Sequence, residues 1–403
     1  MATEPQSYFP YGKQSIDARD VAAVTAALQA EFLTGGPTVA AFEEKFARAV
    51  GAKHAVAVNS ATSALHLALR VAGIGPGDRV VTSPNTFVAS ANCAAYVGAT
   101  PDFSDIHPVS YNLDPRALAQ GWLADTRAVV AVDYAGQPCD LPAIAEIARA
   151  RGAVVIEDAC HAVGSAFAHD GREWQVGGHP WADATVFSFH PVKVMTTMEG
   201  GMYVTDNAAW AAQARRLRSH GLDRQNFVGL GTGVAALDER GPWYYEMQEL
   251  GYNYRLTDVQ CALGLAQLER LGEFCARRRE LVAEYNHLLQ GVSWLRTPGT
   301  LPHVLPDKTG WHLYTVWIDF ERIGRSRTEV MQRLRAAGIG SQVLYIPVYL
   351  QPWYQRTYGY RVGKCPAAEH YYRGALSLPL YPEMALSDVQ RVAAVLQEIG
   401  GGA

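Results

Sequence analysis

The chain has 403 residues, of which 49% are hydrophobic and 18% are charged, a composition that predicts a large buried core and excludes a disordered or fibrous protein. Thirty-five basic and thirty-nine acidic side chains leave a net charge of −4, so the charge balance indicates no nucleic-acid partner. No apolar run approaches the roughly 20 residues that span a bilayer, and the N-terminus lacks the pattern of a signal peptide. We therefore expect a cytoplasmic protein without a membrane partner.

The first 220 residues alternate short β-branched runs with longer amphipathic stretches. The predicted strands are residues 55–58, 79–82, 128–132, 153–157, 185–189 and 202–205. Helices are predicted after Ser60, Thr86 and Asp140. Because strands alternate with helices and are apolar almost throughout, we expect a largely parallel sheet covered on both faces. Functional groups in such sheets collect at the carboxyl ends of the strands.

After residue 222 this pattern gives way to a Gly-rich, partly charged segment that ends near residue 250. A long helix is predicted from Leu256 to about Leu289, and a strand at 313–320 with a helix at 327–338 indicates a smaller α/β lobe. We therefore divide the chain into a large domain, residues 1–255, and a connecting helix with a small C-terminal domain, residues 256–403.

Several motifs that could suggest other chemistry are explained by local structure. The cluster GIGPGD (73–78) lies between a helix and a strand, the wrong order for a phosphate loop, and GLGTG (229–233) follows no predicted strand. The six cysteines contain no C-x-x-C pair. No metal site is expected, because four histidines lack the spacing of metal ligands: His161, His169, His179 and His190.

One lysine lies in a loop between two predicted strands. Lys193 belongs to the segment FSFHPVKVMTTMEGG (187–201), where its neighbours are apolar or carry hydroxyl groups. Partial burial disfavours the charged amine and lowers its pKa, and a neutral amine can attack an aldehyde. A solvated surface lysine is the simpler interpretation of this segment taken alone.

Two further segments favour the chemical interpretation. Asp158 ends the strand VVIED, where its carboxylate can bind a protonated pyridine nitrogen or merely cap the next turn. Residues 59–65, NSATSAL, open a helix whose free N–H groups can hold a phosphate dianion, although N-capping by Ser60 explains them equally. An amine, a pyridine partner and a phosphate site together predict pyridoxal 5′-phosphate (PLP) as the cofactor.

Five blocks carry a family resemblance: NSATSALHLAL, EDACHAVGS, FSFHPVKVMTTMEGG, RSHG and LGYNYRLTDVQCALGLAQL. They resemble the signature blocks of the DegT/DnrJ/EryC1/StrS sugar aminotransferases, and the resemblance runs in order from about Phe9 to Val395. Within that family the chain looks closest to the UDP-4-amino-4,6-dideoxy-N-acetyl-β-L-altrosamine transaminases of pseudaminic acid biosynthesis. This closer likeness rests on FPYGKQSID, VDYAGQPCDL, FSFHPVK and QVLYIPVYLQPWYQ.

The resemblance implies the α/β architecture of the PLP-dependent transferases of fold type I (aspartate aminotransferase-like). It implies that Lys193 is the catalytic residue that binds the cofactor and moves protons, and that Asp158 pairs with the pyridine nitrogen. The other implied cofactor-binding residues are Ala61, Thr62 and Ser188 at the phosphate, Phe87 on the ring, His161 near the cofactor hydroxyl, and Asn253 at the phosphate of the neighbouring subunit. The residues implied to line the sugar-nucleotide site are Tyr11, Glu31, Phe32, Leu33, Thr34, Tyr345, Ile346, Pro347 and Val348.

The implied activity is transfer of the amino group of L-glutamate to C4 of UDP-2-acetamido-2,6-dideoxy-β-L-arabino-hex-4-ulose, a UDP-linked 4-keto-6-deoxy-N-acetylhexosamine. A homodimer with composite active sites is implied as well. The alternatives are amination at C4 or C3 of another UDP- or dTDP-linked keto sugar, a sugar 3-dehydratase, and a non-catalytic binding protein. Those dehydratases replace the lysine by histidine, and a mere binder needs neither Lys193 nor Asp158, so the last two alternatives are disfavoured.

The chain departs from the family pattern at three places. Ile346 stands where relatives commonly have lysine, and Met198 stands where glycine or alanine is commoner. The segment 223–248 is longer than in compact relatives, and we expect it over the mouth of the active site. Tyr349 and Trp353 could add aromatic walls to the sugar site, although aromatic residues at this spacing are more often core.

Overall fold

The computed structural model describes residues 8–229 and 241–401. Its largest element is a seven-stranded sheet with the order β1-β9-β8-β5-β4-β2-β3. The strands are β1 (His54–Val58), β2 (Arg79–Thr82), β3 (Thr100–Phe103), β4 (Thr126–Val132), β5 (Val154–Asp158), β8 (Ala184–Ser188) and β9 (Gly201–Thr205).

The sheet is mostly parallel, and the predicted α/β fold class is confirmed. Strands β3, β2, β4, β5 and β8 run parallel to one another, whereas β9 is antiparallel to both of its neighbours, β1 and β8. All six predicted strands are present. The sequence analysis missed β3, because its residues TPDF contain a proline and no apolar run, and such a strand is tolerated at a sheet edge.

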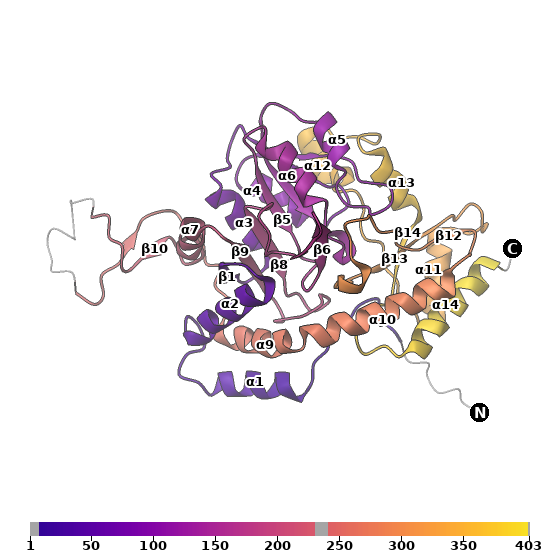
Figure 1. Cartoon of the computed structure of the whole chain (residues 1–403), viewed down its shortest axis with the longest axis horizontal. Helices are drawn as coiled ribbons and strands as arrows, with labels where there is room; N and C mark the ends of the chain where they lie inside the picture. The colour runs from indigo at the N-terminus through magenta and orange to yellow at the C-terminus, as the bar shows by residue number, and fades with distance from the viewer. Residues whose placement is uncertain (1–7, 230–240, 402–403) are drawn as a thin grey trace.

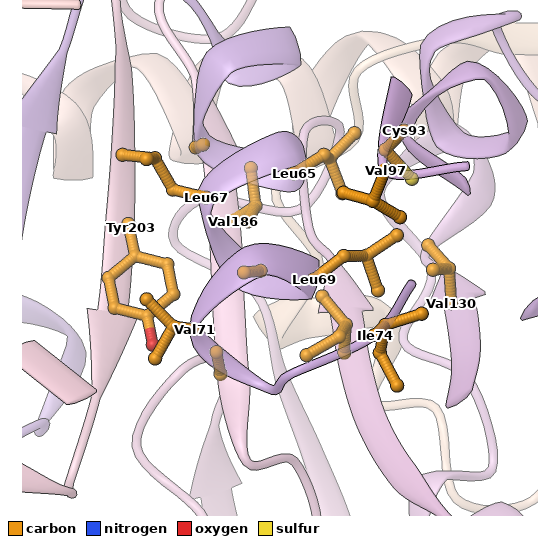
Figure 2. Close-up of a cluster of buried hydrophobic side chains, with 14 of the residues drawn as sticks. Leu65, Leu67, Leu69, Val71, Ile74, Cys93, Val97, Val130, Val186 and Tyr203 are labelled. Atoms are coloured by element: carbon orange, nitrogen blue, oxygen red, sulfur yellow. The ribbon is translucent and has the colours of Figure 1, made fainter. Parts of the chain in front are cut away.

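Helices cover both faces of this sheet because its side chains alternate between them. Val56, Val130 and Ile156 pack against α3 (Ala61–Val71), α4 (Ala89–Tyr96) and α7 (Ala208–Arg218). Figure 2 shows leucines of α3 directed at Val130, Val186 and Tyr203. The opposite face packs against α2 (Pro37–Val50) and α6 (Leu141–Arg149), and α5 (Pro115–Gln120) contacts α6.

The helix predicted from Leu256 to Leu289 is two helices, α9 (Asp258–Glu269) and α10 (Leu271–Leu289), which meet at Arg270. The Arg270 guanidinium forms a buried ion pair with Asp20 of α1 (Ala18–Leu28), with an N–O distance of 2.6 Å. No proline lies at this break. The ion pair at this break joins residues 250 positions apart, so no local sequence pattern predicts it.

A smaller antiparallel sheet, β12 (Leu295–Arg296), β13 (Tyr314–Ile318) and β14 (Ala375–Leu378), forms the C-terminal part of the molecule (Figure 1). It packs with α10, α11 (Arg327–Ala336) and α14 (Leu386–Gly401) around one apolar core. Helices α12 (Pro352–Tyr358) and α13 (Pro366–Gly374) lie between this sheet and β3. The domain boundary at 255/256 stays a prediction.

Two short hairpins complete the fold: β6 (Ala166–His169) with β7 (Arg172–Gln175), and β10 (Leu222–Asp223) with β11 (Glu246–Met247). Figure 1 shows the β10–β11 hairpin projecting away from the body of the molecule. The expected position of segment 223–248 over the active-site mouth stays a prediction, since residues 230–240 lie outside the described ranges. The cluster GLGTG (229–233) falls, after Gly229, outside the described residues. In the described ranges no helix is long and apolar enough to cross a membrane.

Candidate active site

A cavity of about 370 Å³ opens at the carboxyl edge of the large sheet. The register aligns Asp158 with Val132 of β4 and with Val186 of β8, so these strand ends meet at one edge. The cavity brings together nine of the residues that the sequence analysis singled out: Tyr11, Ala61, Thr62, Phe87, Asp158, His161, Ser188, Lys193 and Tyr345.

One end of the cavity is the N-terminus of α3. Ser60 caps this helix, since its Oγ accepts the Ser63 N–H at 3.1 Å, and Ala61 and Thr62 are the first two helical residues. The N–H groups of a first turn have no partner inside the helix and favour an anion. A Cβ on Gly201 would lie 2.5 Å from the Ala61 nitrogen, so only glycine lets β9 approach α3 this closely. Ser188 is paired with Gly201 and therefore lies beside this helix terminus.

Asp158, which is 4% exposed, is held in place by two hydrogen bonds. Ser90 Oγ donates to its Oδ2 at 2.6 Å, and the Cys160 N–H donates to its Oδ1 at 3.2 Å. Ser90 lies on α4, and its hydroxyl also bonds Thr86 Oγ1 at 2.7 Å. The sequence analysis missed Ser90, because nothing in the local pattern marks this serine as the partner of an acid 68 residues away.

Lys193 lies in the turn that follows β8. Its N–H donates to the His190 carbonyl oxygen at 2.9 Å, and the Thr197 N–H donates to the Phe189 carbonyl oxygen at 3.0 Å. These two backbone hydrogen bonds hold the loop in one conformation. Burial lowers the pKa of the Lys193 amine below its ordinary value, an effect that nearby Cys160 and Asp158 partly oppose. This is the direction that the sequence predicts for a partly buried amine.

Aromatic side chains form part of the cavity wall. The Phe87 side chain is 57% exposed although it is large and apolar, and its ring centroid lies 6.3 Å from that of Tyr345. Tyr11 and Leu344 also line the cavity. Exposed aromatic rings beside a carboxylate and an amine are typical of a binding site for a flat, polar-edged ligand.

The remaining sequence-predicted residues lie outside the cavity of a single chain. Glu31, Phe32, Leu33 and Thr34 form an exposed turn between α1 and α2, and Leu33 O accepts the Asp258 N–H at 3.0 Å. Asn253 is exposed and forms a β-bridge with Ser219. Ile346 is exposed outside the cavity lining.

Pro347 and Val348 are buried and do not line the cavity of a single chain. The Val348 N–H donates to the Pro84 carbonyl oxygen at 3.0 Å, which ties this segment to the loop after β2. Among the described residues there is also no group of three or more histidine, cysteine or acidic side chains that could hold a metal ion.

Comparison with known proteins assigns the family. A sequence model of the DegT/DnrJ/EryC1/StrS aminotransferase family matches residues 14–397. The spore coat polysaccharide biosynthesis protein SpsC of Bacillus subtilis is 40% identical over 405 residues, a match that covers all of both chains.

Solved structures agree with this assignment. The chain is similar to Helicobacter pylori PseC, an aminotransferase involved in the biosynthesis of pseudaminic acid, with 30% identity and a TM-score of 0.87 over 98% of this chain and 100% of that one. It is also similar to the PLP form of a protein assigned as a sugar aminotransferase, Spr1654 of Streptococcus pneumoniae, with 26% identity and a TM-score of 0.86 over 98% and 99% of the two chains.

The cavity fits the cofactor of that family. The first turn of α3 suits the phosphate of PLP, the buried Asp158 carboxylate suits its pyridine nitrogen, and Lys193 offers an amine of lowered pKa for its aldehyde. When bound, PLP supplies an electron sink for amino-group transfer. Family match, fold and cavity lead to one conclusion: the chain belongs to the DegT/DnrJ/EryC1/StrS aminotransferase family and is a PLP-dependent sugar aminotransferase.

Proposed function

We propose that the chain transfers the amino group of L-glutamate to C4 of UDP-2-acetamido-2,6-dideoxy-β-L-arabino-hex-4-ulose, in pseudaminic acid biosynthesis. The likeness to PseC over nearly the whole of both chains carries this proposal. The sequence blocks FPYGKQSID and QVLYIPVYLQPWYQ support it. The cytoplasmic location stays a prediction of the sequence.

In this proposal three sets of polar groups in the cavity have separate roles. Lys193 holds the cofactor and moves the proton to and from the reacting carbon, for which its lowered pKa suits it. Asp158, held by Ser90 and the Cys160 N–H, keeps the pyridine nitrogen protonated. Ala61, Thr62 and Ser188, which line the cavity, bind the phosphate.

The sugar would lie against the aromatic wall. Tyr11, Phe87 and Tyr345 line the cavity, and an acetamido sugar with a C6 methyl group requires apolar walls with few polar groups. Tyr349 and Trp353, the other candidates, do not line it. Tyr349 is buried and bonds Glu369, and Trp353 packs against Tyr354 and Tyr358 on α12.

An amination screen tests the substrate. The purified holoenzyme is supplied with L-glutamate and each C5 epimer of the UDP-linked 4-keto sugar, with the matching dTDP-linked sugars in parallel, and products are read by mass. We expect amination of the UDP-linked L-arabino epimer to be fastest. Preference for the D-xylo epimer or for a dTDP-linked sugar would contradict the proposed substrate but not the assignment as a sugar aminotransferase.

We also propose a homodimer with composite active sites, in which the exposed residues Glu31–Thr34 and Asn253 contribute to the partner's cavity. Mixed Lys193→Ala and Asn253→Ala chains should then form heterodimers that contain one site free of both lesions. With random exchange, half of the dimers carry one such site, so about a quarter of wild-type activity should return. No rescue, with subunit exchange demonstrated by mass, would contradict composite sites.

A further inference from the structure

The turn η1 (Tyr134–Gly136), which follows β4, is held tightly by the rest of the chain. The Ala135 carbonyl oxygen accepts the His312 N–H at 2.9 Å. A Cβ on Gly136 would lie 3.1 Å from the carbonyl oxygen of His161, so the turn packs directly against that segment. Ala135 has a φ of +59°, a left-handed conformation that is unfavourable for a non-glycine residue. The surrounding contacts therefore impose the direction of the Ala135 N–H.

That direction determines which nitrogen of His161 carries the hydrogen. The Ala135 N–H donates to His161 Nδ1 at 3.2 Å, so Nδ1 is an acceptor. An imidazolium carries hydrogens on both nitrogens and could not accept at Nδ1, so the ring is neutral. Burial, together with the nearby Lys193, lowers the pKa of His161 well below its ordinary value, in agreement with this state. A neutral imidazole carries a single hydrogen, which must then lie on Nε2.

The Nε2–H of His161 faces the hydroxyl of Tyr345, with a distance of 3.3 Å between Nε2 and Oη. Because Nε2 is the donor, the hydroxyl oxygen accepts, and the hydrogen of Tyr345 itself is directed away from His161. Tyr345 lines the same cavity as Lys193 and Asp158. The phenol is therefore oriented as a donor on the cavity side.

The groups around this pair keep both rings in one protonation state. Burial raises the pKa of Tyr345 well above its ordinary value, and Tyr134, Tyr11, Asp158 and Cys160, which all face it, raise it further. His161 faces Lys193 and the ring of His312, whose centroid is 4.5 Å away and whose own pKa burial lowers.

We propose that Tyr345 is a catalytic hydrogen-bond donor to the ketone oxygen of the substrate, and that His161 and Ala135 are the positioning residues that orient it. The proposal rests on the proposed function, since it requires a carbonyl substrate beside Lys193. In this proposal the Nε2–H of His161 donates its hydrogen bond to Tyr345, whereas the family resemblance places His161 near the cofactor hydroxyl.

The chemistry at this oxygen requires a donor that keeps its own proton. As the incoming amine adds to C4, the C=O bond breaks, the C=N bond forms, and the oxygen leaves as water with both hydrogens of the amine. Negative charge grows on the oxygen during addition, and a fixed donor stabilises it. Tyr345 is neither oxidised nor ionised, in agreement with its raised pKa.

The first test reads the tautomer and needs no substrate. The holoenzyme, with ¹⁵N-labelled imidazoles, is followed by long-range ¹H–¹⁵N correlation, and His161 is assigned by its loss in His161→Gln. We expect a hydrogen on Nε2, none on Nδ1, and no titration between about pH 6 and pH 8. A hydrogen on Nδ1, or a titration in that range, would overturn the proposal whatever the substrate is.

The second test is kinetic. Tyr345→Phe should lower kcat about 100-fold with KM nearly unchanged and with the shape of the pH profile retained. His161→Gln should stay within about 10-fold of the wild type, because its amide offers an acceptor oxygen and a donor nitrogen in place of Nδ1 and Nε2. His161→Leu offers neither and should match Tyr345→Phe, whereas Tyr358→Phe, outside the cavity, should leave kcat unchanged.

The double variant His161→Leu with Tyr345→Phe should be no slower than Tyr345→Phe alone, since residues that act as a unit are not additive. Additive losses, or a His161→Gln enzyme as slow as His161→Leu, would overturn the proposal. If the wild type aminates no keto sugar, the proposed function fails, and the tautomer measurement still judges the His161–Tyr345 pair.

Discussion

The two sheets of this molecule differ in the surroundings of their buried polar groups. In the C-terminal sheet the hydroxyls of Thr315 and Ser377 bond each other at 2.8 Å, and the neighbouring apolar side chains are fully buried. At the carboxyl edge of the large sheet, a buried acid, an amine of lowered pKa and a neutral histidine face one cavity.

The backbone shows the same contrast. Two non-glycine residues next to residues that line the cavity have positive φ values: Ala135, which bonds His161, has 59°, and Met198, which precedes Glu199, has 67°. Strained conformations and shifted pKa values of this kind cluster at functional sites. The C-terminal sheet therefore contributes stability, whereas the carboxyl edge of the large sheet holds buried ionisable groups that serve the chemistry.

The substitution Lys193→Ala should show most clearly that the large-sheet edge serves catalysis rather than stability. We expect turnover to fall by at least about 10⁴-fold, because no second amine in the described cavity can take over the proton transfer. The free energy of unfolding in urea should change by less than about 1 kcal/mol, since the side chain is only half-buried. Lys53→Ala, at an exposed lysine, is the control and should change neither quantity. Appreciable turnover by a pure Lys193→Ala enzyme would remove the lysine from its role.

Leu376→Ala should give the reverse result. Leu376 is fully buried in β14, and truncation of such a leucine costs about 2–5 kcal/mol of unfolding free energy. The kcat of the folded enzyme should stay close to that of the wild type. Denaturant unfolding and kinetics on the same preparation measure both, with the exposed Leu123→Ala as the matched control. A large loss of kcat without a loss of stability would mean that the C-terminal sheet takes part in the reaction.

Asp158→Asn should lower kcat about 100-fold while the fold and part of the cofactor affinity remain. The asparagine amide has the same shape as the carboxylate and can still accept a hydrogen bond from the Ser90 hydroxyl. It carries no charge, however, so it cannot form an ion pair with a protonated pyridine nitrogen. Steady-state kinetics and equilibrium dialysis against PLP measure the two effects. Normal turnover of this variant would make the aspartate a purely structural residue.

The smallest effect concerns the strain at Met198, the position where the chain departs from its family pattern. Met198→Gly should raise the free energy of unfolding by about 1 kcal/mol, because glycine adopts its φ of +67° without cost. Met198→Ala keeps the strain and should bring no gain, which makes it the control. Equal stability of the two variants in thermal unfolding would show that the surrounding contacts, and not the conformation, set the energy at this position.

Local patterns in the sequence predicted much of this fold. The apolar runs at 55–58, 128–132 and 202–205 form strands within one or two residues of the predicted bounds, because side chains in a doubly covered sheet are apolar throughout. Lys193 and Asp158 could be singled out because each follows or ends such a strand. The family, which followed from the quoted blocks, and the cofactor, which followed from the predicted amine, pyridine partner and phosphate site, are confirmed.

Other features carry no local signal. The break at Arg270 coincides with an ion pair to Asp20, which lies 250 residues earlier. Pro347 and Val348, which the family resemblance places in the sugar site, do not line the cavity of a single chain, and the Val348 N–H donates to the Pro84 carbonyl oxygen after β2. Their part in the sugar site stays a prediction.

The sequence by itself determined the order of strands and helices, the loop that carries Lys193, and the helix N-terminus at Ala61, because each depends on neighbours within a few residues. Only the tertiary structure decided that Ser90 holds Asp158, that the Ala135 N–H selects the tautomer of His161, and that Tyr345 receives its hydrogen bond from 184 residues away. These contacts join segments that meet only when the sheet edge and the C-terminal part pack together, and no periodicity or spacing along the chain encodes their geometry.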